Sequence, residues 1–499
     1  MDTKTESAHE VTRRLVGDQE KLLLIGGQWL PAASGRTSPT INPATGDVIA
    51  QIAEGDAADV DRAVTAARAA LNGPWGKLKP ADRQRILLKL AELVEKHAED
   101  FSHLDTLDMG APITRTRGTT KGGLDRVLWY AAQASAIHGS TINNSMPGDF
   151  LSYTIKEPVG VVGAITPWNS PLIATVWKIG PVLATGCTVV LKPAEEAPLT
   201  PLLFGQLCLE AGVPDGVVNV VTGPGETAGA ALAAHLNVDK VAFTGSHLTG
   251  QKIVQAASGN LKRVTLELGG KSPDIVFGDA DLEAAVPGTA MAVFNNAGQI
   301  CHAGTRLFVE TRIYDEFVDR VAEFGRALKV GNGLDPQTQI GPLVSEQQLQ
   351  RVTSYLEAGK RDGARAIVGG ERLTDGAYAA GYFVPPTVFT DVRDNMSIAQ
   401  DEIFGPVISA IPFDDLEEVA QRANTTHFGL ASGVWTRDVA RAHKLARLIA
   451  AGTVWVNCYS VYDPAVPFGG YKMSGYGKEG GVEQMDEYLN LKTVWINAN

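Results

Sequence analysis

The feature that most constrains the fold is an alternation of apolar, strand-like runs with helical stretches after Pro158. The runs cover residues 159–166, 187–193, 217–222, 241–245 and 263–268. The helix after the first run is expected to begin at Ser170-Pro171, an N-cap and a first-turn proline, and to stop at Gly186. This pattern is typical of a parallel sheet with helices on both faces. Such sheets bind ligands at the carboxyl ends of their strands.

The rest of the chain predicts a second α/β unit and several smaller parts. Strand-like runs recur between residues 274 and 468 as DIVF, RLFVE, VISAIPF and GTVWVN, and a helix is expected over 82–101. Residues 1–20 are polar and are expected to be loose. The tail over 490–497 is a lone strand that needs a distant strand or another subunit as its partner. A length of 499 residues suits two large domains or three average ones.

Charge and hydropathy narrow the possible partners. The chain has 44 Lys and Arg against 56 Asp and Glu, a formal charge of −12, which disfavours nucleic acid. The apolar stretch over 171–193 is long enough to resemble a membrane span, but Lys178, Gly180-Pro181 and Gly186 interrupt it. The first residues lack the apolar core of a secretory signal. We therefore expect a soluble cytoplasmic protein with no nucleic-acid or membrane partner.

Cysteine usage points to one candidate nucleophile. No CxxC pair occurs, so neither a disulfide framework nor a Cys-rich zinc site is expected, and no metal is predicted. The segment between Gly298 and Gly304 has no periodicity and holds a cysteine, which is where a reactive thiol is favoured. Motif spacing alone does not exclude a packing role for this cysteine, Cys301. The other three cysteines are interpreted as small core residues. The four are Cys187, Cys208, Cys301 and Cys458.

Glycine is in excess, and part of the excess falls at strand ends. The chain has 53 glycines, roughly 11%, against about 7% in average usage. Residues 223–228 read GPGETA and fit G-x-G-x-x-A, although Pro224 removes an N–H and an ordinary turn fits equally well. A second turn, FTGS over 243–246, places Gly245 and Ser246 where a helix opens toward an anion. Two such turns on one sheet favour a nucleotide.

Charged side chains follow two further strands. Lys192 and Glu195 can both hydrogen-bond a ribose diol, and a carboxylate there would repel a 2′-phosphate, which favours NAD over NADP. A solvated charged loop is the alternative for this tetrapeptide. Glu267 ends a strand beside Gly269 and Gly270, so its carboxylate is expected to be open to a pocket and to water.

Seven motifs together resemble the signatures of the aldehyde dehydrogenase superfamily, in that family's order and spacing. They are TPWNSPL (166–172), LKPAE (191–195), FTGS (243–246), ELGGKS (267–272), GQICHAG (298–304), EIFGPV (402–407) and PFGGYKMSG (467–475). The resemblance covers about residues 22–495. It implies an α/β fold with two Rossmann-like open parallel-sheet domains and a small β oligomerisation arm.

The resemblance also implies a division of the chain and its partners. The expected parts are a dinucleotide-binding domain at 21–138 and 157–268, a catalytic domain at 269–470, and an oligomerisation arm at 139–156 and 485–499. The expected cofactor is NAD, the substrate is a small-molecule aldehyde, and the chain is expected to form a homodimer or homotetramer.

Catalytic roles carry over onto matching residues. Cys301 is implied as the nucleophile, and the side-chain amide of Asn169 with the N–H of Cys301 as the oxyanion hole. Glu267 is implied as the base that activates water for thioester hydrolysis, which favours release of a free acid over transfer to coenzyme A. Lys178 and Glu479 match a proton-relay route behind the site.

Binding roles carry over in the same way. The implied cofactor residues are Ile165, Thr166, Trp168, Lys192, Glu195, Gly225, Gly229, Phe243, Gly245, Ser246, Gly269, Glu402 and Phe404. The implied substrate residues are Ser170, Trp177, Ile300, His302, Tyr459 and Phe468. Tyr462 also falls where the tunnel lining is expected, with a core position as the alternative for Tyr462 and Trp177. His302 is interpreted as pocket lining, with tuning of the thiolate as the alternative.

The sequence leaves the substrate and the competing functions open. Ser170 stands where many family members carry a large residue, so we expect a wide tunnel and a bulky apolar aldehyde, aromatic or terpenoid. The alternatives are an NADP-preferring semialdehyde or betaine-aldehyde dehydrogenase, a cofactor-independent esterase that uses Cys301, and a catalytically silent binding protein on the same fold.

Overall fold

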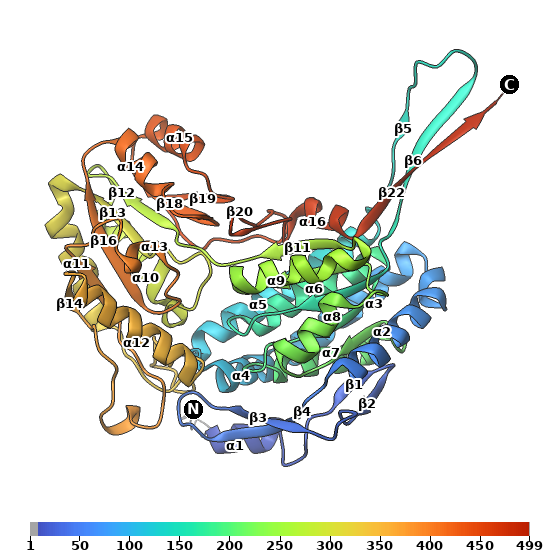
Figure 1. The fold of residues 1–499 in the computed structure, drawn as a ribbon, viewed down its shortest axis with the longest axis horizontal. Helices are drawn as coiled ribbons and strands as arrows, with labels where there is room; N and C mark the ends of the chain where they lie inside the picture. The colour runs from blue at the N-terminus through green and yellow to red at the C-terminus, as the bar shows by residue number, and fades with distance from the viewer. Residues whose placement is uncertain (1–7, 499) are drawn as a thin grey trace.

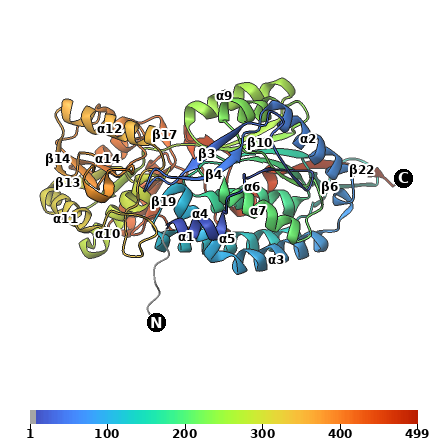
Figure 2. The same ribbon diagram turned by 90° about the horizontal axis from the view of Figure 1, so that it is seen from below.

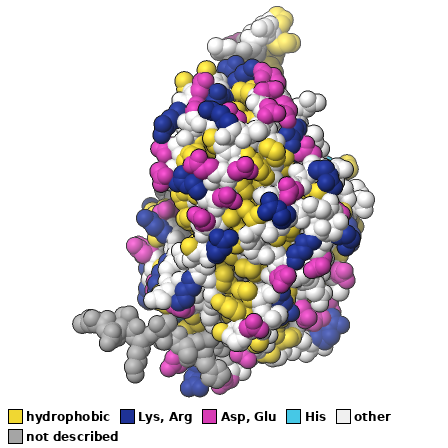
Figure 3. All heavy atoms as spheres, turned by 90° about the vertical axis from the view of Figure 1, so that its left-hand side faces the viewer, with side chains coloured by type: hydrophobic (Ala, Val, Ile, Leu, Met, Phe, Trp, Pro, Cys, Tyr) yellow, Lys and Arg dark blue, Asp and Glu magenta, His cyan; other side chains and the backbone are white. Residues whose placement is uncertain are grey.

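A computed structural model describes residues 8–498 of the chain. Two α/β bodies lie side by side, and a slender arm of strands projects from one of them (Figure 1). The first body contains an eight-stranded sheet and the second a seven-stranded sheet. On the face that Figure 3 shows, acidic and basic side chains are interspersed around apolar ones.

The first sheet has five parallel strands at its centre, in the order β9-β8-β7-β10-β11. Four of the five apolar runs contain one of these strands and the run at 241–245 overlaps β10, so the predicted parallel sheet is confirmed. Strands β1 and β2 extend one edge and β21 the other, all antiparallel. The bounds are β1 (Leu23–Ile25), β2 (Gln28–Leu30), β7 (Val161–Ile165), β8 (Thr188–Lys192), β9 (Val218–Val220), β10 (Lys240–Thr244), β11 (Arg263–Glu267) and β21 (Gly475–Tyr476).

Side chains that alternate along β7 face two different helical layers. Val162 and Ala164 pack into a core with helices α3, α5, α6 and α7, whereas Val161 and Ile165 pack with α2, α8 and α9. Figure 2 shows the two layers on opposite sides of the sheet. The helices are α2 (Ala57–Asn72), α3 (Pro80–Lys96), α4 (Ala98–Met109), α5 (Ile113–Ala134), α6 (Pro171–Thr185), α7 (Leu199–Glu210), α8 (Ala230–Ala234) and α9 (His247–Ala257).

Two helix predictions fared differently. Helix α6 begins after Ser170 with Pro171 in its first turn and ends at Gly186, whose φ of 86° is the left-handed cap that glycine favours. The single helix expected over 82–101 is wrong, because α3 ends and α4 begins at His97. The backbone of His97 has φ −99° and ψ 18°, and its Nδ1 lies 2.9 Å from a carboxylate oxygen of Asp100. Two helices therefore meet at His97, where the apolar spacing alone predicted one continuous helix.

The second sheet has six parallel strands, with β14 added antiparallel at one edge. Its core packs strand residues such as Ile275, Phe308 and Ile411 against Phe294 and Phe317 of the helices. The strands are β12 (Pro273–Val276), β13 (Arg306–Glu310), β14 (Arg365–Val368), β15 (Thr387–Thr390), β16 (Val407–Phe413), β18 (Ala431–Trp435) and β19 (Thr453–Val456). The helices are α10 (Leu282–Phe294), α11 (Tyr314–Ala327), α12 (Glu346–Arg361), α13 (Ser397–Gln400), α14 (Leu416–Ala423) and α15 (Val439–Leu448).

The arm supplies the partner of the C-terminal strand. Strand β22 (Leu489–Asn497) pairs antiparallel with β6 (Phe150–Pro158) over nine residues, and β5 (Thr141–Ile142) pairs with the other side of β6. The tail therefore pairs with a distant strand of its own chain. Short elements complete the fold: β3 (Thr37–Ile41), β4 (Val48–Ala53), β17 (Phe428–Gly429), β20 (Tyr471–Lys472) and α16 (Gly481–Glu487).

The expectation of a loose segment over 1–20 is corrected within the described residues. Helix α1 (Ala8–Leu15) forms there, and Val11 and Val16 are buried against Leu104 and Leu107 of α4. The segment is polar on average, but its apolar side chains lie along one face of the helix and are buried there, which composition alone does not indicate. Residues 1–7 of the prediction lie outside the described residues. Across residues 8–498, no helix is long and apolar enough to cross a membrane.

Candidate active site

Two neighbouring cavities lie at the carboxyl ends of the first sheet. The larger has a volume of about 960 Å³ and the smaller about 420 Å³. Residues close together in the chain line different cavities. Phe243 lines the larger cavity and Thr244 the smaller, and Ile165 lines the larger and Pro167 the smaller. This is the edge at which doubly wound sheets bind ligands.

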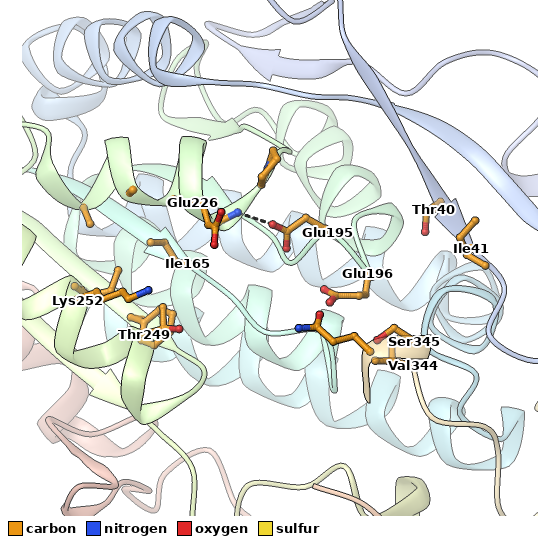
Figure 4. Close-up of a pocket in the computed structure, with 18 of the residues that line it drawn as sticks. Thr40, Ile41, Ile165, Glu195, Glu196, Glu226, Thr249, Lys252, Val344 and Ser345 are labelled. Atoms are coloured by element: carbon orange, nitrogen blue, oxygen red, sulfur yellow. Dashed lines mark hydrogen bonds between the residues drawn. The ribbon is translucent and has the colours of Figure 1, made fainter. Parts of the chain in front are cut away.

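The larger cavity brings together five of the predicted cofactor residues. They are Ile165, Glu195, Gly225, Gly229 and Phe243. Figure 4 shows that side chains from elsewhere close the same cavity: Thr40 and Ile41 of β3, Thr249 and Lys252 of α9, and Val344 and Ser345 before α12. Sequence reasoning missed these, because residues near 40 and 345 carry no motif and reach the cavity only through the fold.

Lys192, Glu195 and Gly225 form one contact group at the ends of β8 and β9. The Lys192 Nζ lies 3.4 Å from Glu195 Oε1, which also accepts a hydrogen bond from the backbone N–H of Gly225 (Figure 4). Lys192 is buried, whereas the Glu195 side chain is 45% exposed. Two more carboxylates, Glu196 and Glu226, line the cavity beside it. This end of the cavity is therefore rich in acidic acceptors.

The second predicted turn begins helix α9. Ser246 is its N-cap, and the Ser246 hydroxyl accepts a hydrogen bond from the N–H of Thr249. Gly245 precedes it, and a Cβ there would lie 2.5 Å from the ring of Phe243. Thr249 in the first turn of α9 lines the cavity, so this helix begins beside it, and a helix N-terminus there suits a pyrophosphate.

The remaining predicted cofactor residues lie between the cavities and the second body. Trp168 and Phe404 meet edge to face at 5.3 Å between ring centroids. The N–H of Gly270 donates to Glu402 Oε1 at 3.1 Å, and a Cβ at Gly269 would lie 2.1 Å from Glu402 Oε2. Gly269 therefore allows the half-buried side chain of Glu402 to approach the end of β11.

Thr166 adds an observation that favours a bound cofactor. It follows β7 and is buried, and its hydroxyl makes no hydrogen bond within residues 8–498. Buried hydroxyls normally find a partner. Thr166 follows Ile165, which lines the larger cavity, so an unpartnered hydroxyl, the Lys192–Glu195 pair and the start of α9 all lie at or beside that cavity and together fit a dinucleotide.

The smaller cavity brings together three of the five predicted catalytic residues and most of the predicted substrate residues. Cys301, Glu267 and Asn169 all line it. The substrate residues in the lining are Ser170, Trp177, Ile300, His302 and Phe468. The rings of Trp177 and Phe468 are stacked at 6.2 Å between centroids.

Tyr459 does not belong to that lining. Its hydroxyl donates to the backbone oxygen of His302 at 2.7 Å, so its side chain lies behind the cavity wall. Tyr462 takes the place in the lining, with its hydroxyl 2.8 Å from Nδ1 of His302. The Nε2 of His302 lies 3.0 Å from the hydroxyl of Ser460. His302 is thus surrounded by hydroxyl groups.

The loop that carries Cys301 is held in one conformation. Gly298 has a φ of 73°, and a Cβ there would lie 1.9 Å from the backbone oxygen of Gly405, so only glycine fits. The next side chain, Gln299, accepts a hydrogen bond from the N–H of Val344 at 2.9 Å. Its backbone oxygen accepts from Nδ2 of Asn169 at 2.9 Å, which ties the amide to this loop.

Burial sets the protonation of the nucleophile and its neighbour. Burial, together with the charges of Glu267 and Glu402, raises the pKa of Cys301, so the neutral thiol is favoured. The Cys301 Sγ lies 3.7 Å from Nδ1 of His302. Burial and the charge of Arg115 lower the pKa of His302 to about 3. The imidazole is therefore neutral near pH 7.

Glu267 lines the same cavity and has a buried, unpartnered oxygen. Burial, with the charge of Glu479, raises the pKa of Glu267 to about 8. Behind it, Lys178 and Glu479 form a buried ion pair, and Glu479 also accepts from Nε2 of Gln484 at 2.6 Å. Gln484 in turn accepts from the hydroxyl of Tyr130, so a chain of polar groups extends inward from the base.

Two arginines in this cavity were missed by sequence reasoning. Arg115 and Arg126 of α5 are both part of the lining. No motif marks them, and only the packing of α5 against α6 turns them toward Cys301.

These features define the class of protein. The aldehyde dehydrogenase family matches residues 29–494, and the chain belongs to that family, whose members are oxidoreductases that act on aldehydes with a nicotinamide cofactor. Among relatives, the mitochondrial aldehyde dehydrogenase of Homo sapiens is 50% identical over 483 residues, which cover 95% of this chain and 92% of that protein.

Solved structures agree with this assignment. The NAD+ complex of an aldehyde dehydrogenase from Bacillus cereus has a TM-score of 0.96 and 46% identity, with all of both chains covered. A betaine aldehyde dehydrogenase from Staphylococcus aureus in complex with NAD+ has a TM-score of 0.96 and 37% identity, over 98% of this chain and 96% of that chain.

Proposed function

We propose that this enzyme oxidises an aldehyde to the carboxylic acid with NAD, through a covalent adduct on Cys301 and hydrolytic release. The observation that carries the proposal is the single cavity shared by Cys301, Glu267 and Asn169, next to a larger cavity suited to a dinucleotide. The overall reaction consumes one aldehyde, one NAD+ and one water, and yields one carboxylate, one NADH and two protons.

The first step is attack of the Cys301 sulfur on the aldehyde carbon. Because burial favours the thiol, its proton must leave as the bond forms, and Glu267 is the carboxylate in the same cavity that can accept it. The amide of Asn169 has two N–H donors and uses one on Gln299, so one remains for the oxyanion, together with the N–H of Cys301. Each such donor is worth about 3 kcal/mol.

The second half of the reaction releases the acid. When bound, the nicotinamide of the cofactor accepts the hydride from the tetrahedral adduct. A thioester then remains on Cys301, and Glu267 activates water for its hydrolysis. The buried pair of Lys178 and Glu479, which lies behind Glu267, provides a route for the proton that Glu267 collects.

NAD is the cofactor that the lining favours over NADP. We propose that Lys192 and Glu195 bind the adenine ribose and that the N-terminus of α9, with Ser246 and Trp168, holds the pyrophosphate. Glu402 and Phe404 would contact the nicotinamide riboside. Three carboxylates near the ribose position, those of Glu195, Glu196 and Glu226, would repel a 2′-phosphate. The NAD+ complexes of the related structures support this choice.

The substrate proposal changes in one respect. Ser170 lines the cavity, which supports room for a bulky aldehyde, and Trp177 and Phe468 add apolar surface. A wholly apolar substrate would, however, leave Nε and Nη1 of Arg115 and Nε of Arg126 without acceptors in a desolvated cavity. The expectation of an apolar aldehyde rests on Ser170 and takes no account of these two arginines.

We further propose that the arm mediates a homodimer or homotetramer. Strand β22 lies at the edge of the arm sheet, and apolar side chains on the arm are exposed, among them Leu491 at 65% and Trp495 at 53%. Sedimentation velocity of the wild type and of Leu491→Lys tests this. A wild-type monomer would overturn the proposal, and dissociation of the variant would support it.

NADH formation tests the proposed reaction. A panel of aliphatic and aromatic aldehydes, followed by absorbance with NAD, should give steady turnover for at least one of them. Cys301→Ala should abolish it, whereas Cys458→Ala, which removes a half-buried thiol outside the cavity lining, should retain it. The proposal fails if no aldehyde yields NADH, or if Cys301→Ala remains active.

A further inference from the structure

The substrate cavity contains two arginines for which the reaction has no use. Arg115 and Arg126 lie on the same side of α5, about 16 Å apart along its axis, and both line the cavity of Cys301. Gly118 and Gly122 lie between them in the lining. A Cβ at Gly118 would meet no atom within 4 Å, so the helix face between the arginines is open.

These arginines carry donors that the protein leaves without acceptors. The Nε and Nη1 of Arg115 and the Nε of Arg126 are buried and make no hydrogen bond within residues 8–498. Arg126 is only 6% exposed, its Nη1 donates to the backbone oxygen of Gly122 at 2.7 Å, and its guanidinium lies 4.9 Å over the ring of Trp177. By contrast, Arg117 on the same helix is exposed and holds Glu99 through Nε and Nη2, each at 2.9 Å.

The acidic and titratable groups near Arg115 do not neutralise it. Burial raises the pKa of Asp105 to about 7, and its carboxyl is engaged by the hydroxyl of Thr200 at 2.6 Å. Burial lowers the pKa of Arg115 to about 10, which leaves it cationic at neutral pH. His302 is neutral, as shown above. Glu267 is the carboxylate among the described residues that line this cavity, and burial raises its pKa to about 8, so near pH 7 it does not fully offset the two guanidinium charges.

A cation in a dry cavity is costly unless an anion accompanies it. Arginine donors bind carboxylates through paired, charge-assisted hydrogen bonds. We propose that the substrate aldehyde carries a carboxylate remote from its reacting end, and that Arg115 and Arg126 bind this carboxylate while the aldehyde meets Cys301. The inference rests on the proposed function, because it names the substrate class of that same site.

The rest of the lining agrees with a molecule that is anionic at one end and apolar in the middle. The stacked rings of Trp177 and Phe468 offer apolar surface between the arginines and the nucleophile's loop. Oxidation of such a substrate gives a dicarboxylate. The reaction that supplies the substrate must therefore generate an aldehyde on a carbon chain or ring that already bears a carboxylate.

Matched acid and ester substrates test the proposal. The probes are 4-formylbenzoate with its methyl ester and 5-oxopentanoate with its methyl ester, each measured for NADH formation by the wild type. The acid of at least one pair should have a kcat/KM roughly 10- to 100-fold above its ester, mainly through a lower KM, since the ester cannot accept a charge-assisted pair. Equal or better turnover of both esters would overturn the proposal.

Variants of the two arginines locate the effect. Arg115→Gln and Arg126→Gln should each raise the KM of the acid about 10-fold or more and leave the KM of the ester nearly unchanged. Lysine at the same positions should give a partial acid preference compared with the glutamine variants. Lysine keeps the positive charge but lacks the planar guanidinium that pairs two N–H groups with a carboxylate. Arg117→Gln is the matched control on the exposed side of α5 and should behave as wild type.

The outcomes separate this inference from the proposed function. NADH from the esters with no preference for the acids leaves the oxidation proposal intact and rejects the anionic substrate. No NADH from any aldehyde rejects the oxidation proposal itself. If a glutamine variant fails to fold, the wild-type comparison of each acid with its ester still decides, because a wild type without acid preference rejects the proposal.

Discussion

The two cavities of this enzyme differ in the charged side chains that line them, although only a strand end separates them. The larger is lined mainly by acidic groups, Glu195, Glu196 and Glu226 against Lys252, whereas the smaller holds Arg115 and Arg126 against Glu267. The net charge of the whole chain, −12, describes the charge of neither cavity. The contrast teaches that local lining, not overall charge, decides which ligand is attracted, because the dry walls of a cavity focus the field of the charges beside it.

The cavities also differ in how the chain builds them. Most of the larger lies within residues 165–256, at successive strand ends and helix starts of one sheet. The smaller is assembled from α5, α6, the loop before Cys301 and the segment at 460–468. Loss of a group in the larger cavity should therefore change cofactor choice, whereas loss of one in the smaller should stop a chemical step.

Glu267→Gln should show the largest effect. Removal of the base should lower steady-state turnover roughly 10²- to 10⁴-fold and leave formation of the adduct less affected. Rapid mixing with aldehyde and NAD should then show a burst of about one NADH per active site, followed by almost no further product. A variant that turns over steadily, or one that gives no burst because Cys301 no longer attacks the aldehyde, would contradict separate roles for Glu267 and Cys301.

A smaller effect is expected in the pH dependence of turnover. Glu267 acts as a carboxylate, and its pKa is raised to about 8, so hydrolysis of the thioester should rise with pH through about 8 and be lost below it. Glu479→Gln removes a charge that raises this pKa and leaves Lys178, which lowers it. The profile should therefore move to lower pH, by about one unit.

The measurement is kcat against pH from 6 to 10 with a substrate whose hydrolysis limits the rate. Glu483→Gln, in the exposed first turn of α16, is the matched control and should leave the profile unchanged. A shift to higher pH in Glu479→Gln would show that the buried pair acts on Glu267 with the opposite sign.

The contrast between the cavities also explains what the sequence could predict. The strands at 161–165 and 188–192 were predicted within two residues, because continuous apolar runs are typical of buried parallel strands. Cys301 stood out through its glycine-rich surroundings. These are local signals, and they mark places where the backbone itself makes the site.

Arg115 could not be distinguished from Arg117 in the same way. Both lie in the basic first half of α5, two residues apart, yet one lines the cavity and the other is exposed with Glu99. Only the packing of α5 on α6 decides between them. Tyr459 failed for the same reason, since its hydroxyl reaches the backbone of His302 and its neighbour Tyr462 takes the place in the lining.

The smallest effect is expected in the larger cavity, at Glu195. Glu195→Gln removes one negative charge beside Lys192 and should raise the ratio of NADP to NAD turnover, measured as kcat/KM, by about 10-fold or less. The effect is limited because the side chain is 45% exposed and water screens its charge. Glu226→Gln, farther along the same lining, should change the ratio less. If the two variants shift it equally, cofactor choice depends on the summed acidity of the cavity, and the bond from Glu195 to the ribose would have no special part in it.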